Sequence, residues 1–87
     1  MYFVYVLKSE KDSLFYTGFT SDLERRVLEH NQGLQDSTRS RVPFKLVYYE
    51  WCLNKQDALS REEYLKSGMG KKYIRNRIKL FLSSDNK

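Results

Sequence analysis

The segment FYTGFTSDLERRVLEHNQG, residues 15–33, contains the change of hydrophobic period on which the fold depends. Aromatic and β-branched side chains predict a short strand over residues 14–19, where the segment begins. Ser21 and Glu24 then have the spacing of a capping box, which predicts a helix over residues 22–32. The chain is therefore expected to pass directly from a strand into a helix.

Two other stretches carry strand signals. Residues 2–7 and 44–51 are rich in β-branched and aromatic side chains. A polar turn over residues 9–13 separates the first of these from the strand at 14–19, and strands joined so closely are most simply an antiparallel hairpin. The sequence thus predicts a small sheet of three strands.

Two more helices follow the third strand. Asn54 is a favourable N-cap for a helix over residues 55–67. Gly68 and Gly70 are expected to break that helix, because glycine lowers helix stability. A third helix is predicted over residues 71–82, so the elements run in the order β-β-α-β-α-α.

This order predicts an α+β fold, a small three-stranded antiparallel sheet flanked by three helices. We expect one domain over residues 1–82 and a frayed C-terminal tail over residues 83–87. Residues 33–43, between the first helix and the third strand, are polar and contain Arg39 and Arg41. They are predicted to form an exposed basic loop.

Composition excludes several classes of protein. The chain has 87 residues, 40% hydrophobic and 31% charged, which is a globular composition. Its only cysteine, Cys52, excludes an internal disulfide framework and a cysteine-rich zinc site. No apolar run is long enough for a membrane span, so a cytoplasmic location is expected. The net charge of +5 is a first indication of a polyanionic partner.

Polar side chains interrupt the apolar face of the first helix. At helical spacing, Leu23 and Val27 form this face, with His30 inside it and Arg26 at its rim, whereas Arg25 faces solvent. Taken alone, His30 is as well explained by a core histidine with satisfied hydrogen bonds, and Arg26 by a side chain that extends to solvent.

Glu62 lies in the middle of the apolar face of the second helix, between Ala58 and Leu65. An ionised carboxylate in such a place must be paired, bind a metal ion or become neutral. Two interpretations follow: a metal ligand, or a buried ion pair with Arg26.

The third helix has one apolar face and one basic face. Ile74, Ile78, Phe81 and Leu82 share the apolar face; Lys72, Arg75, Asn76 and Lys79 share the opposite one. The basic face is either a solvated surface or a track for a nucleic-acid backbone.

Together these residues resemble a known pattern. Tyr5 ends the triplet Phe3-Val4-Tyr5, Tyr16 begins the triplet Tyr16-Thr17-Gly18, and Arg26, His30 and Glu62 follow on the two helices. The spacing is similar to that of the GIY-YIG nuclease superfamily, most of all its small stand-alone bacterial branch, which is related to the incision-subunit nuclease domain of excision repair. The resemblance covers residues 2 to about 80.

The resemblance implies a metal-dependent endonuclease that hydrolyses phosphodiester bonds in DNA, in repair or processing. It implies catalytic roles for Tyr5, Tyr16, Arg26, His30 and Glu62, with Glu62 anchoring one Mg²⁺ or Mn²⁺ ion. Mg²⁺ accepts a single carboxylate when waters and substrate oxygens complete its shell. Of the two tyrosines, Tyr16 is the slightly favoured base, because Gly18 beside it would permit close approach to a phosphate.

A further set of residues is predicted to contact nucleic acid, with RNA as well as DNA open as the substrate: Gly18, Arg39, Arg41, Lys66, Lys71, Lys72, Arg75, Asn76 and Lys79. Two rival functions stay open. One is a non-catalytic nucleic-acid-binding module of the same fold. The other is a nuclease subunit that needs a protein partner for targeting, suggested by the aromatic residues Tyr48, Tyr49 and Trp51. No partner at a membrane is expected.

Overall fold

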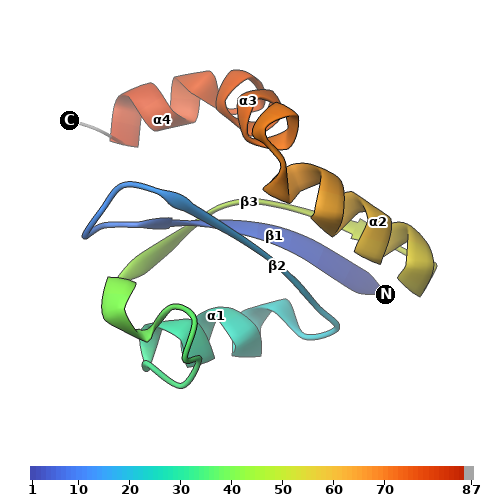
Figure 1. Cartoon of the computed structure of the whole chain (residues 1–87), viewed down its shortest axis with the longest axis horizontal. Helices are drawn as coiled ribbons and strands as arrows, with labels where there is room; N and C mark the ends of the chain where they lie inside the picture. The colour runs from blue at the N-terminus through green and yellow to red at the C-terminus, as the bar shows by residue number, and fades with distance from the viewer. Residues whose placement is uncertain (86–87) are drawn as a thin grey trace.

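The computed structural model describes residues 1–85 and shows a twisted sheet with helices on both faces (Figure 1). Its strands are β1 (Tyr2–Ser9), β2 (Phe15–Thr20) and β3 (Phe44–Cys52). β1 is the central strand and pairs antiparallel with both neighbours, in the order β2-β1-β3. The predicted α+β class and three-stranded antiparallel sheet are confirmed.

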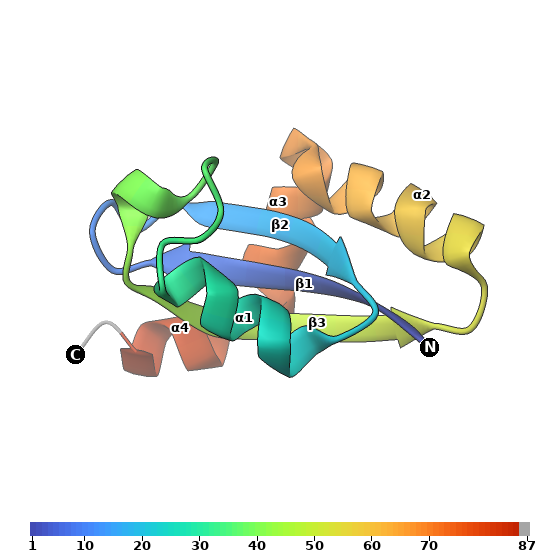
Figure 2. The same ribbon diagram turned by 90° about the horizontal axis from the view of Figure 1, so that it is seen from below.

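The helices divide between the two faces of the sheet. α1 (Leu23–Asn31) covers one face, and α2 (Lys55–Lys66), α3 (Gly68–Arg77) and α4 (Lys79–Asp85) lie on the other (Figures 1 and 2). Within residues 1–85, none of these helices has the length and apolar character that crossing a bilayer requires.

Successive side chains of β1 point to opposite faces of the sheet, so β1 contributes to the core on both faces. Val4 and Val6 point to one face and pack with Ala58, Leu65 and Ile74 of α2 and α3. Tyr5 and Leu7 point to the other and pack with Phe44, and around them lie Leu23 and Val27 of α1. The strand is buried on both faces because each face is covered by helices.

α1 begins differently from the prediction. Asp22 is its N-cap, since the Asp22 carboxylate accepts a hydrogen bond from the Arg25 N–H at 3.2 Å. The Asp22 N–H in turn donates to the Thr20 hydroxyl at 3.0 Å. The predicted N-cap, Ser21, is therefore wrong by one residue. Asp22 is as good a cap as serine, and the Thr20 hydroxyl accepts the hydrogen bond of the Asp22 N–H.

The predicted third helix is two helices. α3 ends at Arg77 and α4 begins at Lys79, so the part of the chain that the structure describes has four α-helices and not three. Ile78 separates the two helices, with φ −117° and ψ 30°. Residues 83–85, where a frayed tail is predicted, continue α4, and the rest of that predicted tail, residues 86–87, lies outside the described residues.

The two glycines after α2 start α3. Ser67 ends α2 and caps α3, because its hydroxyl accepts the Gly70 N–H at 3.1 Å. A Cβ on Gly70 would lie 2.0 Å from the Tyr64 carbonyl oxygen, so only glycine permits this close packing of α3 on the end of α2.

The loop from residue 33 to 43, predicted to be exposed, is partly buried. It contains a 3₁₀ turn over Arg39–Arg41, and Thr38 just before it is fully buried. The Arg41 guanidinium binds the Asp12 carboxylate at 2.7 Å and the Leu14 carbonyl at 3.2 Å, which ties the loop to the turn between β1 and β2. These contacts hold the loop against that turn.

Candidate active site

Five predicted residues meet at the β2 edge of the sheet. In the antiparallel register Tyr5 is opposite Gly18, and Leu7 is opposite Tyr16, so both tyrosines belong to the face covered by α1. The ring of His30 lies 5.8 Å from that of Tyr5 and 5.1 Å from that of Tyr16, between centroids. Arg26 and Glu62 both act electrostatically on the Tyr5 hydroxyl.

A chain of hydrogen bonds runs through the middle of this group. The Tyr5 hydroxyl lies 2.8 Å from His30 Nε2, and His30 Nδ1 lies 2.7 Å from the Thr38 hydroxyl. All three side chains are buried. Both imidazole nitrogens are therefore satisfied, as the interpretation of His30 as a core histidine requires, but one of them is engaged by a residue with a predicted catalytic role.

Thr38 was not anticipated from the sequence. It lies in the polar loop eight residues after His30, and no periodicity or capping pattern distinguishes it there. Its hydroxyl also lies 3.5 Å from the Gln35 carbonyl oxygen, which can only accept a hydrogen bond. Only the folded loop shows that Thr38 contacts the imidazole.

Burial dominates the electrostatics of Tyr5. It raises the pKa of Tyr5 to about 12, and the neighbouring Tyr16 and Glu62 act in the same direction. The charge and hydrogen bonding of the Arg26 guanidinium lower this pKa. Tyr5 is thus a neutral phenol near pH 7, and a neighbouring cation or a proton acceptor must assist any loss of its proton.

His30 is shifted in the direction that keeps it neutral. Burial first, and then the positive charge of Arg26, lower the pKa of His30 from its usual 6.5, with Glu29 opposing them. A neutral imidazole has one nitrogen able to accept a proton. Next to a phenol of high pKa, it is the group best placed to receive the phenolic proton.

Gly18 has a different role from the one expected. A Cβ at this position would lie 2.3 Å from the Tyr5 hydroxyl oxygen, so the Tyr5 ring itself fills the space that the missing side chain leaves. The argument that Gly18 leaves room for a phosphate, and thereby favours Tyr16 as the base, has no support in this packing. Glycine is needed here because the phenol crosses the neighbouring strand.

We expect Gly18→Ala to lower the rate of any reaction that uses Tyr5 and His30 together by about 100-fold, because the added methyl would push the Tyr5 hydroxyl away from His30. Gly68→Ala is the matched control, since no atom lies within 4 Å of a Cβ there. Rates for the two variants, measured beside thermal unfolding, check this prediction. Equal activity of the two proteins would contradict it.

One interpretation of the sequence paired Arg26 with Glu62. The structure does not show this ion pair. Arg26 Nε binds Glu29 of its own helix at 3.3 Å, and Glu62 binds Lys66 of its own helix at 3.2 Å. The Glu62 side chain is 19% exposed and the Arg26 side chain 33% exposed. Both groups therefore keep one side open to a ligand at the β2 edge.

The donor set at this edge suits a hard cation that keeps most of its waters. Within residues 1–85 no three His, Cys, Asp or Glu side chains come together as a metal cage. The Glu62 carboxylate is partly exposed, and one carboxylate with waters around it is a donor set that Mg²⁺ or Mn²⁺ tolerates and structural Zn²⁺ sites do not use. The residues present thus fit a single divalent cation held by one carboxylate.

Basic side chains surround the outer side of β2. Lys66 and Lys71 line a hollow of about 250 Å³ together with Phe15, Tyr16 and Thr17. Arg75 of α3 stacks over the Phe15 ring, with its guanidinium carbon 5.5 Å from the ring centroid. The basic surface therefore extends from the residues around Tyr16 to Arg75 of α3, along the β2 edge.

The other predicted nucleic-acid contacts differ in their surroundings. Lys72, Asn76 and Lys79 are exposed on the helices beyond α2. Arg39 pairs with Asp36, and Arg41 with Asp12, so both loop arginines already have carboxylate partners. Lys66 is likewise paired, with Glu62, whereas Lys71 and Arg75 take part in none of the ion pairs found within residues 1–85.

Comparison with known proteins agrees with this arrangement. Residues 1–74 match the GIY-YIG catalytic domain. The chain is 51% identical over 67 residues to a UPF0213 protein of Clostridium perfringens, covering 76% of this chain and 71% of that protein. It is 46% identical over 67 residues to a UPF0213 protein of Haloquadratum walsbyi, covering 76% of this chain and 74% of that one.

A solved structure extends the comparison to the fold. The solution NMR structure of a UPF0213 protein from Bacillus halodurans superposes with a TM-score of 0.55 and is 34% identical, covering 87% of this chain and 84% of that one. The resemblance inferred from the two tyrosine triplets is thus confirmed over most of the chain, and the protein belongs to the GIY-YIG family of nuclease domains.

Proposed function

We propose that this protein is a metal-dependent endonuclease that hydrolyses phosphodiester bonds in DNA, in repair or processing. Membership of the GIY-YIG family supports a nuclease acting on nucleic acid. The observation that carries the proposal is the buried chain Tyr5–His30–Thr38, which ends beside Arg26 and Glu62 at an edge lined by lysines. If these side chains only filled the core, they would have no need to gather beside an exposed basic surface.

Glu62 is the residue that would hold the cation, Mg²⁺ or Mn²⁺. When bound, such a cation stabilises the negative charge that develops on the phosphate and on the departing oxygen. Lys66, which pairs with Glu62 at 3.2 Å, is then available to a phosphate oxygen of the substrate instead. Arg26 can bind a non-bridging oxygen, because its guanidinium is partly exposed and carries donors beyond the one that meets Glu29.

Tyr5 and His30 would move the proton of the attacking water. The Tyr5 oxygen is buried in the free protein, so the substrate must admit a water to it; this water hydrogen-bonds to the Tyr5 oxygen and attacks phosphorus, and its proton passes to that oxygen while the phenolic proton passes to His30 Nε2. The opposite P–O bond breaks, and the departing oxygen takes a proton from solvent. His30 then returns its proton through Tyr5 to solvent, which restores the starting state.

Thr38 determines which imidazole nitrogen is available for this transfer. If its hydroxyl proton points to the Gln35 carbonyl, the Thr38 oxygen accepts the Nδ1–H of His30, and Nε2 is left unprotonated towards Tyr5. Thr38 is thus a positioning residue for the proton acceptor.

Thr38→Val is expected to lower the rate constant of cleavage about tenfold with little change in KM, since second-sphere partners of histidine have effects of this size. Thr38→Ser keeps the hydroxyl and should retain the rate. Nitrogen NMR of the His30 ring checks the cause: Nε2 is expected to be unprotonated in the parent and Nδ1 to lose its fixed proton in the valine variant. An unchanged tautomer in Thr38→Val would contradict the role given to Thr38.

The direct test of the function is incubation of the pure protein with supercoiled, branched and single-stranded DNA, and with RNA, in Mg²⁺, Mn²⁺ or EDTA. Cleavage that requires the cation is the expected result. The rival function, a binding module without catalysis, predicts salt-dependent DNA binding through the basic residues of α3 and no cleavage in any metal. Binding without cleavage of any of these substrates would favour that rival.

A further inference from the structure

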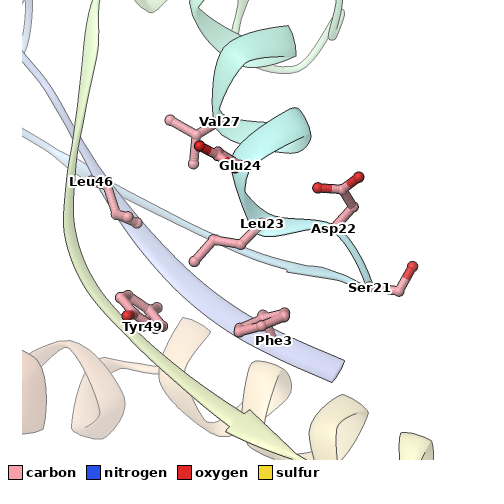
Figure 3. A pocket seen from close by; sticks show the side chains of 8 residues that line it. All are labelled: Phe3, Ser21, Asp22, Leu23, Glu24, Val27, Leu46 and Tyr49. Carbon is pink, nitrogen blue, oxygen red and sulfur yellow. The ribbon is translucent and has the colours of Figure 1, made fainter. Parts of the chain in front are cut away.

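An apolar hollow opens on the α1 face of the sheet, beside the β3 edge (Figure 3). It measures about 640 Å³, and its apolar walls come from three elements: Phe3, Leu23, Val27, Leu46 and Tyr49. The β2 edge with the candidate active site lies across the sheet from it, because β1 separates the two outer strands. The hollow is therefore a surface that the proposed chemistry does not use.

Aromatic side chains make its floor unusually apolar for an exposed surface. The rings of Phe3 and Tyr49 contact at 6.1 Å between centroids. Tyr49 is 51% exposed, and Trp51, opposite Phe3 in the register and so on the same face, is 54% exposed. Exposed apolar groups gathered in this way are typical of a surface that another molecule covers.

The charge at the rim of the hollow is opposite to that of the whole chain. Asp22 and Glu24 are the only charged residues among those that line it, in a protein of net charge +5. Asp22 is held in place as the N-cap of α1. Arg25 lies beside Asp22 and Glu24, but its guanidinium and that of Arg26 both bind Glu29. Nucleic acid is repelled by such a rim, whereas a cationic ligand is attracted.

We propose that this hollow binds an extended segment of a partner protein in which a bulky apolar residue is flanked by lysine or arginine. The apolar residue would fill the hollow between Leu23 and Tyr49, and the basic residues would meet Asp22 and Glu24. Because β3 is the outer strand on this side, an extended segment can also lie along it and pair with its backbone. The β2 edge stays open, so the partner and a DNA substrate can bind together.

The test uses the full chain labelled with nitrogen-15 and two synthetic peptides, acetyl-GKLFRG-amide and its counterpart acetyl-GELFEG-amide. We expect amide shifts confined to the residues of the hollow, and at least about threefold tighter binding of the basic peptide at low salt, with the difference shrinking as salt is raised. Equal affinities, or shifts at the β2 edge, would overturn the proposal.

Two variants separate the contributions without touching the candidate active site. Asp22→Asn with Glu24→Gln removes the rim charge but keeps an N-cap, because asparagine caps as well as aspartate. It should abolish the preference for the basic peptide. Tyr49→Ala should weaken both peptides, and Leu53→Ala, at an exposed leucine outside the hollow, should weaken neither. Self-association through the same residues, seen by sedimentation, would replace the partner with a second copy and overturn the proposal.

Discussion

Glu62→Gln is expected to abolish metal-dependent cleavage, with a loss of about 10³-fold or more. The variant keeps the size of the side chain but removes the one carboxylate that could anchor the cation in this site. Its charge is also the partner of Lys66 at 3.2 Å, so that lysine is released towards the substrate. DNA affinity should therefore stay the same or rise while cleavage disappears.

Glu63→Gln is the matched control, since Glu63 is the next residue of α2 and is exposed. It should cleave as the parent does. Enhanced relaxation of water protons by Mn²⁺ gives a readout without catalysis: the signal from bound Mn²⁺ is expected in the parent and in Glu63→Gln, and to be lost in Glu62→Gln. Full activity of Glu62→Gln would eliminate Glu62 as the metal anchor, whatever the reaction.

Tyr5→Phe is expected to reduce the cleavage rate by about 10²- to 10⁴-fold, the range for loss of a general acid–base group. The phenylalanine ring fills the same space between Gly18 and His30, so the fold should persist. Removing the hydroxyl leaves His30 Nε2 without its 2.8 Å partner and leaves the attacking water without a proton acceptor.

Tyr16→Phe distinguishes the two tyrosines. Tyr16 touches the His30 ring edge-on and lines the basic hollow, but the structure shows its hydroxyl in no hydrogen bond with His30. We expect its loss of rate to be at least tenfold smaller than that of Tyr5→Phe. The reverse order would assign the base to Tyr16.

The pH dependence of the rate follows from His30. Because burial and Arg26 lower the pKa of His30 below its usual 6.5, the imidazole accepts a proton at pH 7 and continues to do so as the pH falls to 6.5. The acidic limb of the rate profile should therefore lie below pH 6.5. Tyr5, with a pKa of about 12, contributes no limb near neutral pH.

Local patterns were sufficient for the fold class, and they also led to the predicted site residues. The alternation of β1, the helical spacing of Arg26 and His30, and the position of Glu62 inside an apolar stripe are all properties of neighbouring residues. Their resemblance to the GIY-YIG pattern then connected elements far apart in the chain. The fold class is confirmed because period and spacing determine which face a side chain occupies; the roles given to the site residues stay predictions.

Other features depend on contacts between distant segments and could not be predicted locally. The ends of the helices are one example: Asp22 replaced Ser21 as the cap because the Thr20 hydroxyl was in reach, and the third helix divided at Ile78. The choice between ion pairs is another. Glu62 binds Lys66 and Arg26 binds Glu29, each on its own helix, so the pair between Glu62 and Arg26 does not form.

The sequence by itself determined the α+β class, the family and the five side chains expected to carry the chemistry. Only the tertiary structure decided that Tyr5 passes over Gly18 to reach His30, and that Thr38 holds the other side of the imidazole. It also decided that the apolar hollow with its acidic rim lies beside β3, with β1 between it and the basic β2 edge. The physical reason is that hydrogen bonds and burial depend on the distance between atoms in space, which residues 8 or 25 positions apart acquire only when the chain folds.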